Sequence, residues 1–142
     1  MNEPIPPYGH EDTSFRTAGG EQGVRQLVDA FYDVMEELPQ ADKILKMHPR
    51  NLEISRDKLA RFLAGWLGGP KLYREKYGPI RIPVAHRHLP IGPKERDAWL
   101  ACMEKAVAQQ ENWPDTFKTY FMREIAVPAE RSRNRDYGME IQ

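Results

Sequence analysis

The sequence has a single cysteine, Cys102, among its 142 residues. One thiol excludes a disulfide within the chain and is typical of proteins in a reducing compartment. Residues 1–7 combine proline with polar residues and lack the basic and apolar parts of a secretion signal. We therefore expect a cytoplasmic protein.

Long apolar runs and an excess of one charge are also missing. No apolar stretch approaches the roughly 20 residues that a membrane-spanning helix needs, so no membrane segment is expected. The 21 basic residues are balanced by 21 acidic residues, which argues against the broad basic face of a nucleic-acid-binding protein. The length predicts one domain.

Apolar residues recur at helical spacing in four stretches, near 21–38, 55–67, 94–110 and 114–126. Shorter helical segments are expected at 13–18 and 41–47, with a broken helix within 70–92. No stretch has the alternation of a β-strand. We predict an all-α fold with four main helices and short accessory helices. The helical domain would cover residues 13–127, between a flexible arm (1–12) and a charged, disordered tail (128–142).

The centre of the chain is marked by the run from Trp66 to Tyr73, which contains Gly-Gly-Pro. Two glycines followed by a proline end a helix abruptly. A segment rich in proline and glycine follows over 78–93 and carries His86 and His88. A histidine on an irregular segment between two apolar helices is well placed to hold a ligand between them.

Four side chains on or beside apolar faces are candidates for chemistry: Tyr32, His48, His86 and Trp99. Each has a common structural explanation. A tyrosine at a helix edge often reaches water, a tryptophan on an apolar face usually belongs to the core, and histidines beside prolines are usually exposed. Their order and spacing are more informative than any one of them.

Several short motifs occur in the order found in one known family. The sequence resembles the group II truncated haemoglobins, which have a 2-over-2 helical globin fold, over residues 13–125. The matching stretches are Gly19-Gly20, Phe31-Tyr32, His48-Pro49, Phe62-Leu63, the Trp66–Tyr73 run and Trp99 to Met103. The resemblance implies haem b held between two helix pairs, one proximal histidine on the iron, and O2, NO or CO as ligands.

Two histidines compete for the proximal position. Arg87-His88-Leu89-Pro90 resembles the family's Arg-His-x-Pro run and points to His88. His86, however, lies 18 residues after Gly68 and 13 before Trp99, which matches the spacing of the family's ligand without gaps. We predict His86 as the iron ligand, with His88 directed to a haem propionate or to solvent.

The resemblance also implies the rest of the pocket. Tyr32, Trp99 and His48 would be the distal groups that hydrogen-bond a bound ligand. Phe31, Ser55, Leu59, Phe62 and Met103 would surround the haem, and Lys58, Tyr73, Arg81 and His88 would lie near its polar edge. Ala85 replaces the arginine that usually precedes the proximal histidine. Either Arg87 or His88 would take over its contact with the propionate, or the propionate would be held less firmly.

Three functions stay open at this stage. The first is reversible binding of O2 and other diatomic ligands by a monomer or homodimer. The second is a haem redox enzyme, peroxidase-like or nitric oxide detoxifying, that needs an unidentified reductase. The third is a haem-free helical interaction domain, or a zinc site built from His48, His86 and His88.

Overall fold

The computed structural model describes residues 7–134, except for the side chains of residues 84 and 85. Within this range the chain forms helices and no strand, which confirms the predicted all-α class with four long helices. None of these helices is long and apolar enough to cross a bilayer. The elements are α1 (Thr13–Thr17), α2 (Gly20–Glu37), η1 (Pro39–Ala41), α3 (Asp42–Lys46), α4 (Glu53–Trp66), α5 (Leu72–Tyr77), α6 (Ile82–His86), α7 (Pro93–Ala108) and α8 (Asp115–Arg131).

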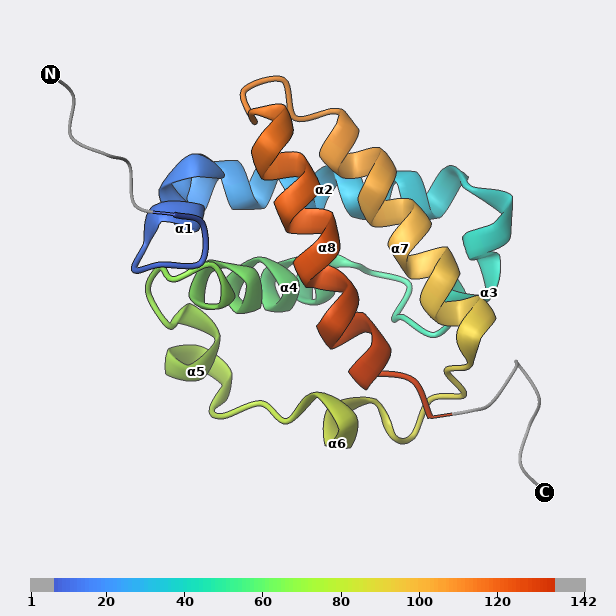
Figure 1. The fold of residues 1–142 in the computed structure, drawn as a ribbon. Coiled ribbons are helices and arrows are strands. Elements are labelled where there is room, and N and C mark those ends of the chain that lie inside the picture. Colours follow the sequence, from blue (N-terminus) through green and yellow to red (C-terminus); the bar gives the residue numbers. More distant parts are fainter. Residues whose placement is uncertain (1–6, 135–142) are drawn as a thin grey trace, which may run out of the picture.

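The four long helices form two layers (Figure 1). Helices α2 and α4 pack against each other in one layer, and α7 packs against α8 in the other. Helix α2 also contacts α7, so that it joins the two layers. The short helices α5 and α6 lie along one edge, on the path from α4 to α7.

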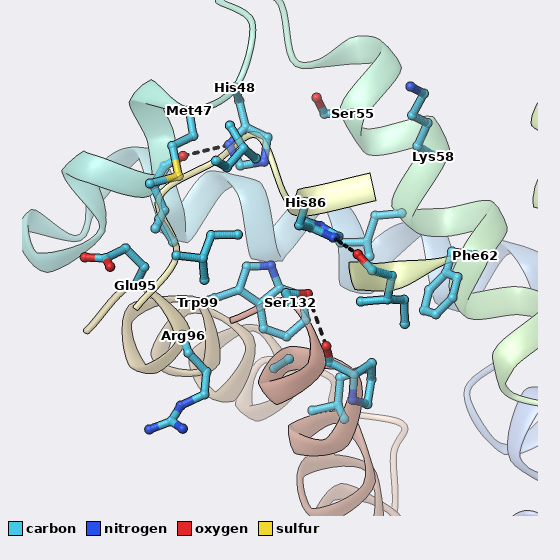
Figure 2. A pocket seen from close by; sticks show the side chains of 18 of the residues that line it. Met47, His48, Ser55, Lys58, Phe62, His86, Glu95, Arg96, Trp99 and Ser132 are labelled. Carbon is cyan, nitrogen blue, oxygen red and sulfur yellow. Dashed lines mark hydrogen bonds between the residues drawn. The ribbon is translucent and has the colours of Figure 1, made fainter. Parts of the chain in front are cut away.

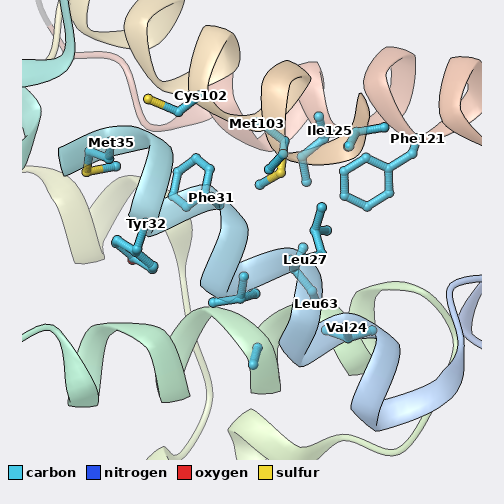
Figure 3. Close-up of a cluster of buried hydrophobic side chains, with 14 of the residues drawn as sticks. Val24, Leu27, Phe31, Tyr32, Met35, Leu63, Cys102, Met103, Phe121 and Ile125 are labelled. Carbon is cyan, nitrogen blue, oxygen red and sulfur yellow. The ribbon is translucent and has the colours of Figure 1, made fainter. Parts of the chain in front are cut away.

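The core forms where α2 meets the other three long helices (Figure 3). Helix α2 contributes a stripe at helical spacing that includes Val24, Leu27 and Phe31. Leu63 of α4 and Phe121 of α8 pack against this stripe, and all five side chains are almost completely buried. This packing fixes α2, which also carries Tyr32.

The Gly-Gly-Pro run ends α4 and also packs closely against the N-terminal segment that contains α1. Gly68 has a φ of +93°, and a Cβ atom there would lie 2.0 Å from the carbonyl oxygen of Glu11. A Cβ on Gly69 would lie 2.6 Å from the ring of Phe15. The Phe15 amide donates to the Leu67 carbonyl at 3.1 Å. The glycines are therefore required by the close approach of the N-terminal segment as well as by the helix end.

Residues 1–12 are predicted to form a flexible arm, and within this segment Tyr8 packs on α8. The Tyr8 ring contacts Phe117 with 5.1 Å between ring centroids, and its hydroxyl lies 2.9 Å from Oγ1 of Thr116. Burial of this aromatic ring offsets the entropy lost on ordering the segment. Residues 1–6 lie outside the described range.

The last helix is longer than the sequence predicts. Instead of ending near residue 126, α8 continues through Pro128 to Arg131. Pro128 lies in the last turn, where its missing N–H removes only one helical hydrogen bond. The buried side chain of Ala129 favours continuation of the helix. Residues 128–131 of the expected tail are thus helical, and residues 135–142 lie outside the described range.

The Gly68 junction can be tested by adding one methyl group. Gly68→Ala should destabilise the fold by clearly more than Gly20→Ala, because both positions have positive φ but only Gly68 faces a backbone oxygen. An alanine at positive φ should cost about 1 kcal/mol of stability in both variants. The clash of the new Cβ with the Glu11 carbonyl oxygen should cost Gly68→Ala about 1–2 kcal/mol more. Urea unfolding of both variants measures the difference, and equal losses would contradict the proposed role of the contact with Glu11.

Candidate functional site

A cavity of about 330 Å³ lies between α4, α6, the start of α7 and the end of α8 (Figure 2). Its size is in the range of sites for small molecules and cofactors. Most lining side chains are apolar, and the polar ones come from different segments. His48 follows α3, His86 ends α6 and Trp99 lies on α7, and all three line the same space.

The orientation of His86 is fixed by its own helix. Its Nδ1 lies 2.8 Å from the carbonyl oxygen of Ile82, and because a carbonyl can only accept, Nδ1 carries the proton. The Nε2 atom then keeps its lone pair, which is the form of imidazole that binds a metal ion. His86 is half-buried and lines the cavity.

His48, which follows α3, has a similar local arrangement. Its Nδ1 lies 2.8 Å from the carbonyl oxygen of Ile44. Burial lowers the pKa of His48 below its usual value, and the proximity of His86 lowers it further, whereas the backbone hydrogen bonds act in the opposite direction. His48 is therefore neutral at pH 7, with Nε2 able to accept a hydrogen bond.

Tyr32 brings a hydroxyl to the cavity. The residue is only 5% exposed, and no hydrogen bond joins its hydroxyl to another group within residues 7–134. Burial raises the pKa of the phenol well above its usual value, although Arg56 acts to lower it, so the hydroxyl stays a neutral donor. It can therefore donate a hydrogen bond to a group that enters the cavity.

Ring contacts connect Tyr32, Trp99 and His48 to the core. The Phe31 ring lies 5.0 Å from the Tyr32 ring and 5.0 Å from the Trp99 ring, measured between centroids. The His48 and Tyr32 rings meet edge to face with 5.5 Å between centroids. The Trp99 indole N–H, like the Tyr32 hydroxyl, has no hydrogen-bond partner in the described part of the chain. The aromatic contacts therefore fix two donors that the described residues do not satisfy.

Most residues that the sequence assigns to the site line this cavity, and their roles stay predictions. They are Tyr32, His48, Ser55, Lys58, Leu59, Phe62, Tyr73, His86 and Trp99. Phe31 and Met103 do not line it, because both are completely buried in the core. Arg81 lines a neighbouring groove. His88 is exposed and also lies outside the cavity lining.

Other lining residues were missed because they lie on short segments or at helix ends, where periodicity gives no signal. They are Ile44, Met47, Ile80, Ile82, Leu89, Ile91, Glu95, Arg96, Ile125, Pro128, Ala129 and Ser132. Pro128, Ala129 and Ser132 belong to the stretch that the sequence places in the tail. An aliphatic residue four positions before a histidine, as at Ile82, is too common a pattern to identify a site.

Glu95 is a buried carboxylate that holds the start of α7. Its Oε1 accepts the Gly92 amide at 2.7 Å, and its Oε2 lies 3.2 Å from Nζ of Lys43. The first contact satisfies a free amide at the helix N-terminus, and the second connects α7 to α3. Glu95 thereby fixes the helix that presents Trp99.

Asp57 holds the opposite edge of the site. Its carboxylate accepts hydrogen bonds from the Tyr77 hydroxyl at 2.6 Å and from Arg25 at 2.6 Å, and also from Arg61 and Lys76. Burial raises the pKa of Asp57, but these donors outweigh burial and hold it well below its usual value. Helices α2 and α5 are thus tied to α4, and the Tyr77 ring lies 5.1 Å from Tyr73 at the cavity.

The lining meets the needs of a haem. His86 presents an imidazole nitrogen, and Leu59, Phe62 and Ile82 give apolar walls. Tyr32 adds a hydroxyl donor at the cavity. A zinc site from three histidines is not supported. Within residues 7–134 no three His, Cys, Asp or Glu side chains are grouped to hold a metal ion.

The network around Asp57 gives a prediction for stability. Asp57→Asn should lower the free energy of unfolding at pH 7 by about 2 kcal/mol, since it removes charge-assisted bonds in a side chain that is only 17% exposed. Asp33→Asn is the control, because Asp33 pairs with Arg56 but is 67% exposed; its loss should be below about 1 kcal/mol.

The loss of stability caused by Asp57→Asn should depend on pH. The folded-state pKa of Asp57 is depressed, so its stabilisation is present above the unfolded pKa of about 3.9 and is lost as pH falls towards the folded value. The difference between wild type and Asp57→Asn should therefore shrink below about pH 4. Urea unfolding at several pH values measures it, and a constant difference down to pH 2 would contradict this account.

Comparison with known proteins agrees with this geometry. A sequence profile of the bacterial-like globin family matches residues 13–129. The group 2 truncated hemoglobin YjbI of Bacillus subtilis (strain 168) is 38% identical over 88 residues, which are 62% of this chain. The matched part spans 64% of that relative's length, which is less than two thirds.

Solved structures give the same result for the whole fold. The group II 2-on-2 hemoglobin from Agrobacterium tumefaciens superposes with a TM-score of 0.81 at 30% identity, covering 94% of this chain and 98% of that one. The truncated oxygen-avid haemoglobin from Bacillus subtilis gives a TM-score of 0.76 at 29% identity, covering 85% and 98%. The chain therefore belongs to the bacterial-like globin family, and its fold is that of the group II 2-on-2 truncated haemoglobins, as the sequence predicted.

Proposed function

We propose that the chain binds haem b in the cavity, with His86 as the proximal iron ligand, and takes up O2 and other diatomic ligands reversibly. The observation that carries this proposal is a pair of groups at one cavity. His86 has Nδ1 held by a carbonyl and Nε2 left for a metal, and Tyr32 has a hydroxyl at the cavity that makes no hydrogen bond within residues 7–134. Membership of the globin family supports it.

The walls of the cavity suit a large planar, mostly apolar cofactor. Leu59, Phe62 and Ile82 would cover its faces, and burial of apolar area would provide most of the binding free energy. Lys58 and Tyr73, also on the lining, would reach the propionates at the rim through charge-assisted hydrogen bonds. His86 would hold the iron through Nε2.

When bound, haem supplies an iron centre with an open position for a diatomic ligand. The protein's part is to place donors beside that position. Tyr32 and Trp99 would each donate a hydrogen bond, and His48 would complete the polar side of the pocket. Donors in a site that excludes water favour a ligand that gains negative charge, so they would retain O2 more strongly than CO. The structural relative from Bacillus subtilis is described as oxygen-avid, which supports this assignment.

A second candidate is haem-based redox chemistry, and the position of His48 favours it. Its imidazole lines the cavity, and its ring edge meets Tyr32. A neutral imidazole there could take a proton from a peroxide and return it to the leaving oxygen. Turnover would require two electrons from an external reductase. Stopped-flow mixing of the oxygenated protein with NO, compared with the rate of O2 loss, separates catalysis from storage.

The choice of proximal ligand is tested by two histidine variants. His86→Ala should abolish or greatly weaken haem binding, because it removes the imidazole that lines the cavity. His88→Ala should leave the ferrous spectrum nearly unchanged, because His88 is exposed. Haem titration followed by absorbance measures both. Loss of binding in His88→Ala, with His86→Ala intact, would refute the assignment.

The distal donors are tested by O2 dissociation. Tyr32→Phe and Trp99→Phe should each speed O2 release by about tenfold or more, since one hydrogen bond in a dry pocket contributes about 1–3 kcal/mol. Tyr120→Phe is the matched control, because Tyr120 packs against Tyr8, outside the cavity lining. Stopped-flow replacement of O2 by CO gives the rates. An unchanged rate would remove that residue from the donor set.

A further inference from the structure

The segment between α6 and α7 has an anchor far away in the sequence. Asn134, three residues beyond the end of α8, makes three hydrogen bonds to it. The Asn134 Nδ2 donates to the His86 carbonyl at 3.0 Å, and the Asn134 Oδ1 accepts the Ile91 amide at 2.9 Å. The Asn134 amide donates to the Ile91 carbonyl at 2.7 Å. One residue thus joins both ends of the turn that follows His86.

This bridge depends on the amide side chain. The planar amide group of Asn134 offers a donor and an acceptor, and here each is matched to a backbone group of opposite polarity. The His86 carbonyl also accepts the Leu89 amide at 2.9 Å, which closes the turn. Because the His86 ring is already held by Ile82, the Asn134 contact fixes the backbone from which that ring projects.

The end of α8 is well placed to hold Asn134 in position. Figure 1 shows the C-terminal end of α8 close to α6 and to the segment that leads into α7. Arg96 of α7 forms an ion pair with Glu130, and Glu130 lies 3.2 Å from Nε of Arg133. The hydroxyl of Ser132 donates to the Pro128 carbonyl at 3.1 Å. Asn134 therefore projects from a segment that several polar contacts hold in place.

We propose that Asn134 is a positioning residue for the proximal histidine. It acts through the backbone of His86 and sets the direction in which Nε2 points, so Asn134 belongs to the site although it lies beyond the end of α8. This inference rests on the proposed function, because it matters for haem only if His86 binds the iron. Removal of a hydrogen bond that orients a metal ligand typically lowers metal affinity about 10-fold to 100-fold.

The test uses the full chain loaded with haem. Asn134→Asp keeps an oxygen for the Ile91 amide but places a second oxygen against the His86 carbonyl, whereas Asn134→Ala removes both side-chain contacts. The matched control is Asn112→Asp, on the exposed turn before α8. Resonance Raman of the ferrous protein reports the iron–histidine stretch, and transfer of haem to an excess of an acceptor apoprotein reports its release.

We expect both Asn134 variants to shift or broaden the iron–histidine band and to release haem about tenfold faster or more, with Asn112→Asp unchanged. A band and a release rate equal to those of the wild type would overturn the inference. The haem-free chain provides an independent measurement. The Ile91 amide should exchange with solvent faster in Asn134→Ala than in the wild type, and equal exchange would also overturn it.

The two proposals fail in different ways. If the wild type takes up no haem, the proposed function is wrong, and amide exchange in the haem-free chain still decides whether Asn134 holds the turn. If the wild type binds haem through His86 and the Asn134 variants match it, only the positioning role is wrong. Because Asn134 lies at the edge of the fold, the alanine variant should fold even if the aspartate variant does not.

Discussion

The hydrogen bond between His86 Nδ1 and the Ile82 carbonyl is the contact on which the site depends. It selects the tautomer of the imidazole and turns Nε2 away from the backbone. Helix α6 runs only from Ile82 to His86, which is just long enough for a side chain to reach a carbonyl four residues back. A single helical turn therefore suffices to orient the His86 imidazole, provided that the rest of the segment is held from outside.

The Tyr32 hydroxyl and the Trp99 indole N–H are held in a different way. Neither group has a hydrogen-bond partner in the described part of the protein. Phe31 is fully buried and packs against both rings, so the core fixes the two donors without satisfying them. Because both side chains line the cavity, they can donate to a group that enters it.

The sequence predicted what depends on local pattern. Periodicity identified the long helices, and the spacing from Gly68 and Trp99 selected the histidine that lines the cavity rather than its neighbour. The resemblance assigned Phe31 and Met103 to the pocket, but it did not show that both side chains are completely buried in the core. Contacts such as that between Asn134 and His86 join residues 48 apart and leave no local pattern, so only the folded structure reveals them.

The segment from the end of α4 to the start of α7 shows why the site can accept a large cofactor. Helix α5 has no buried residue, so core packing does not hold it. Polar anchors hold the segment instead, with Asp57 fixing α5 at one end and Glu95 and Asn134 fixing the other end. Hydrogen bonds at the edges leave the inner face of the segment apolar and free of interlocked side chains. Filling that face with a flat cofactor would add buried area without disrupting an existing core.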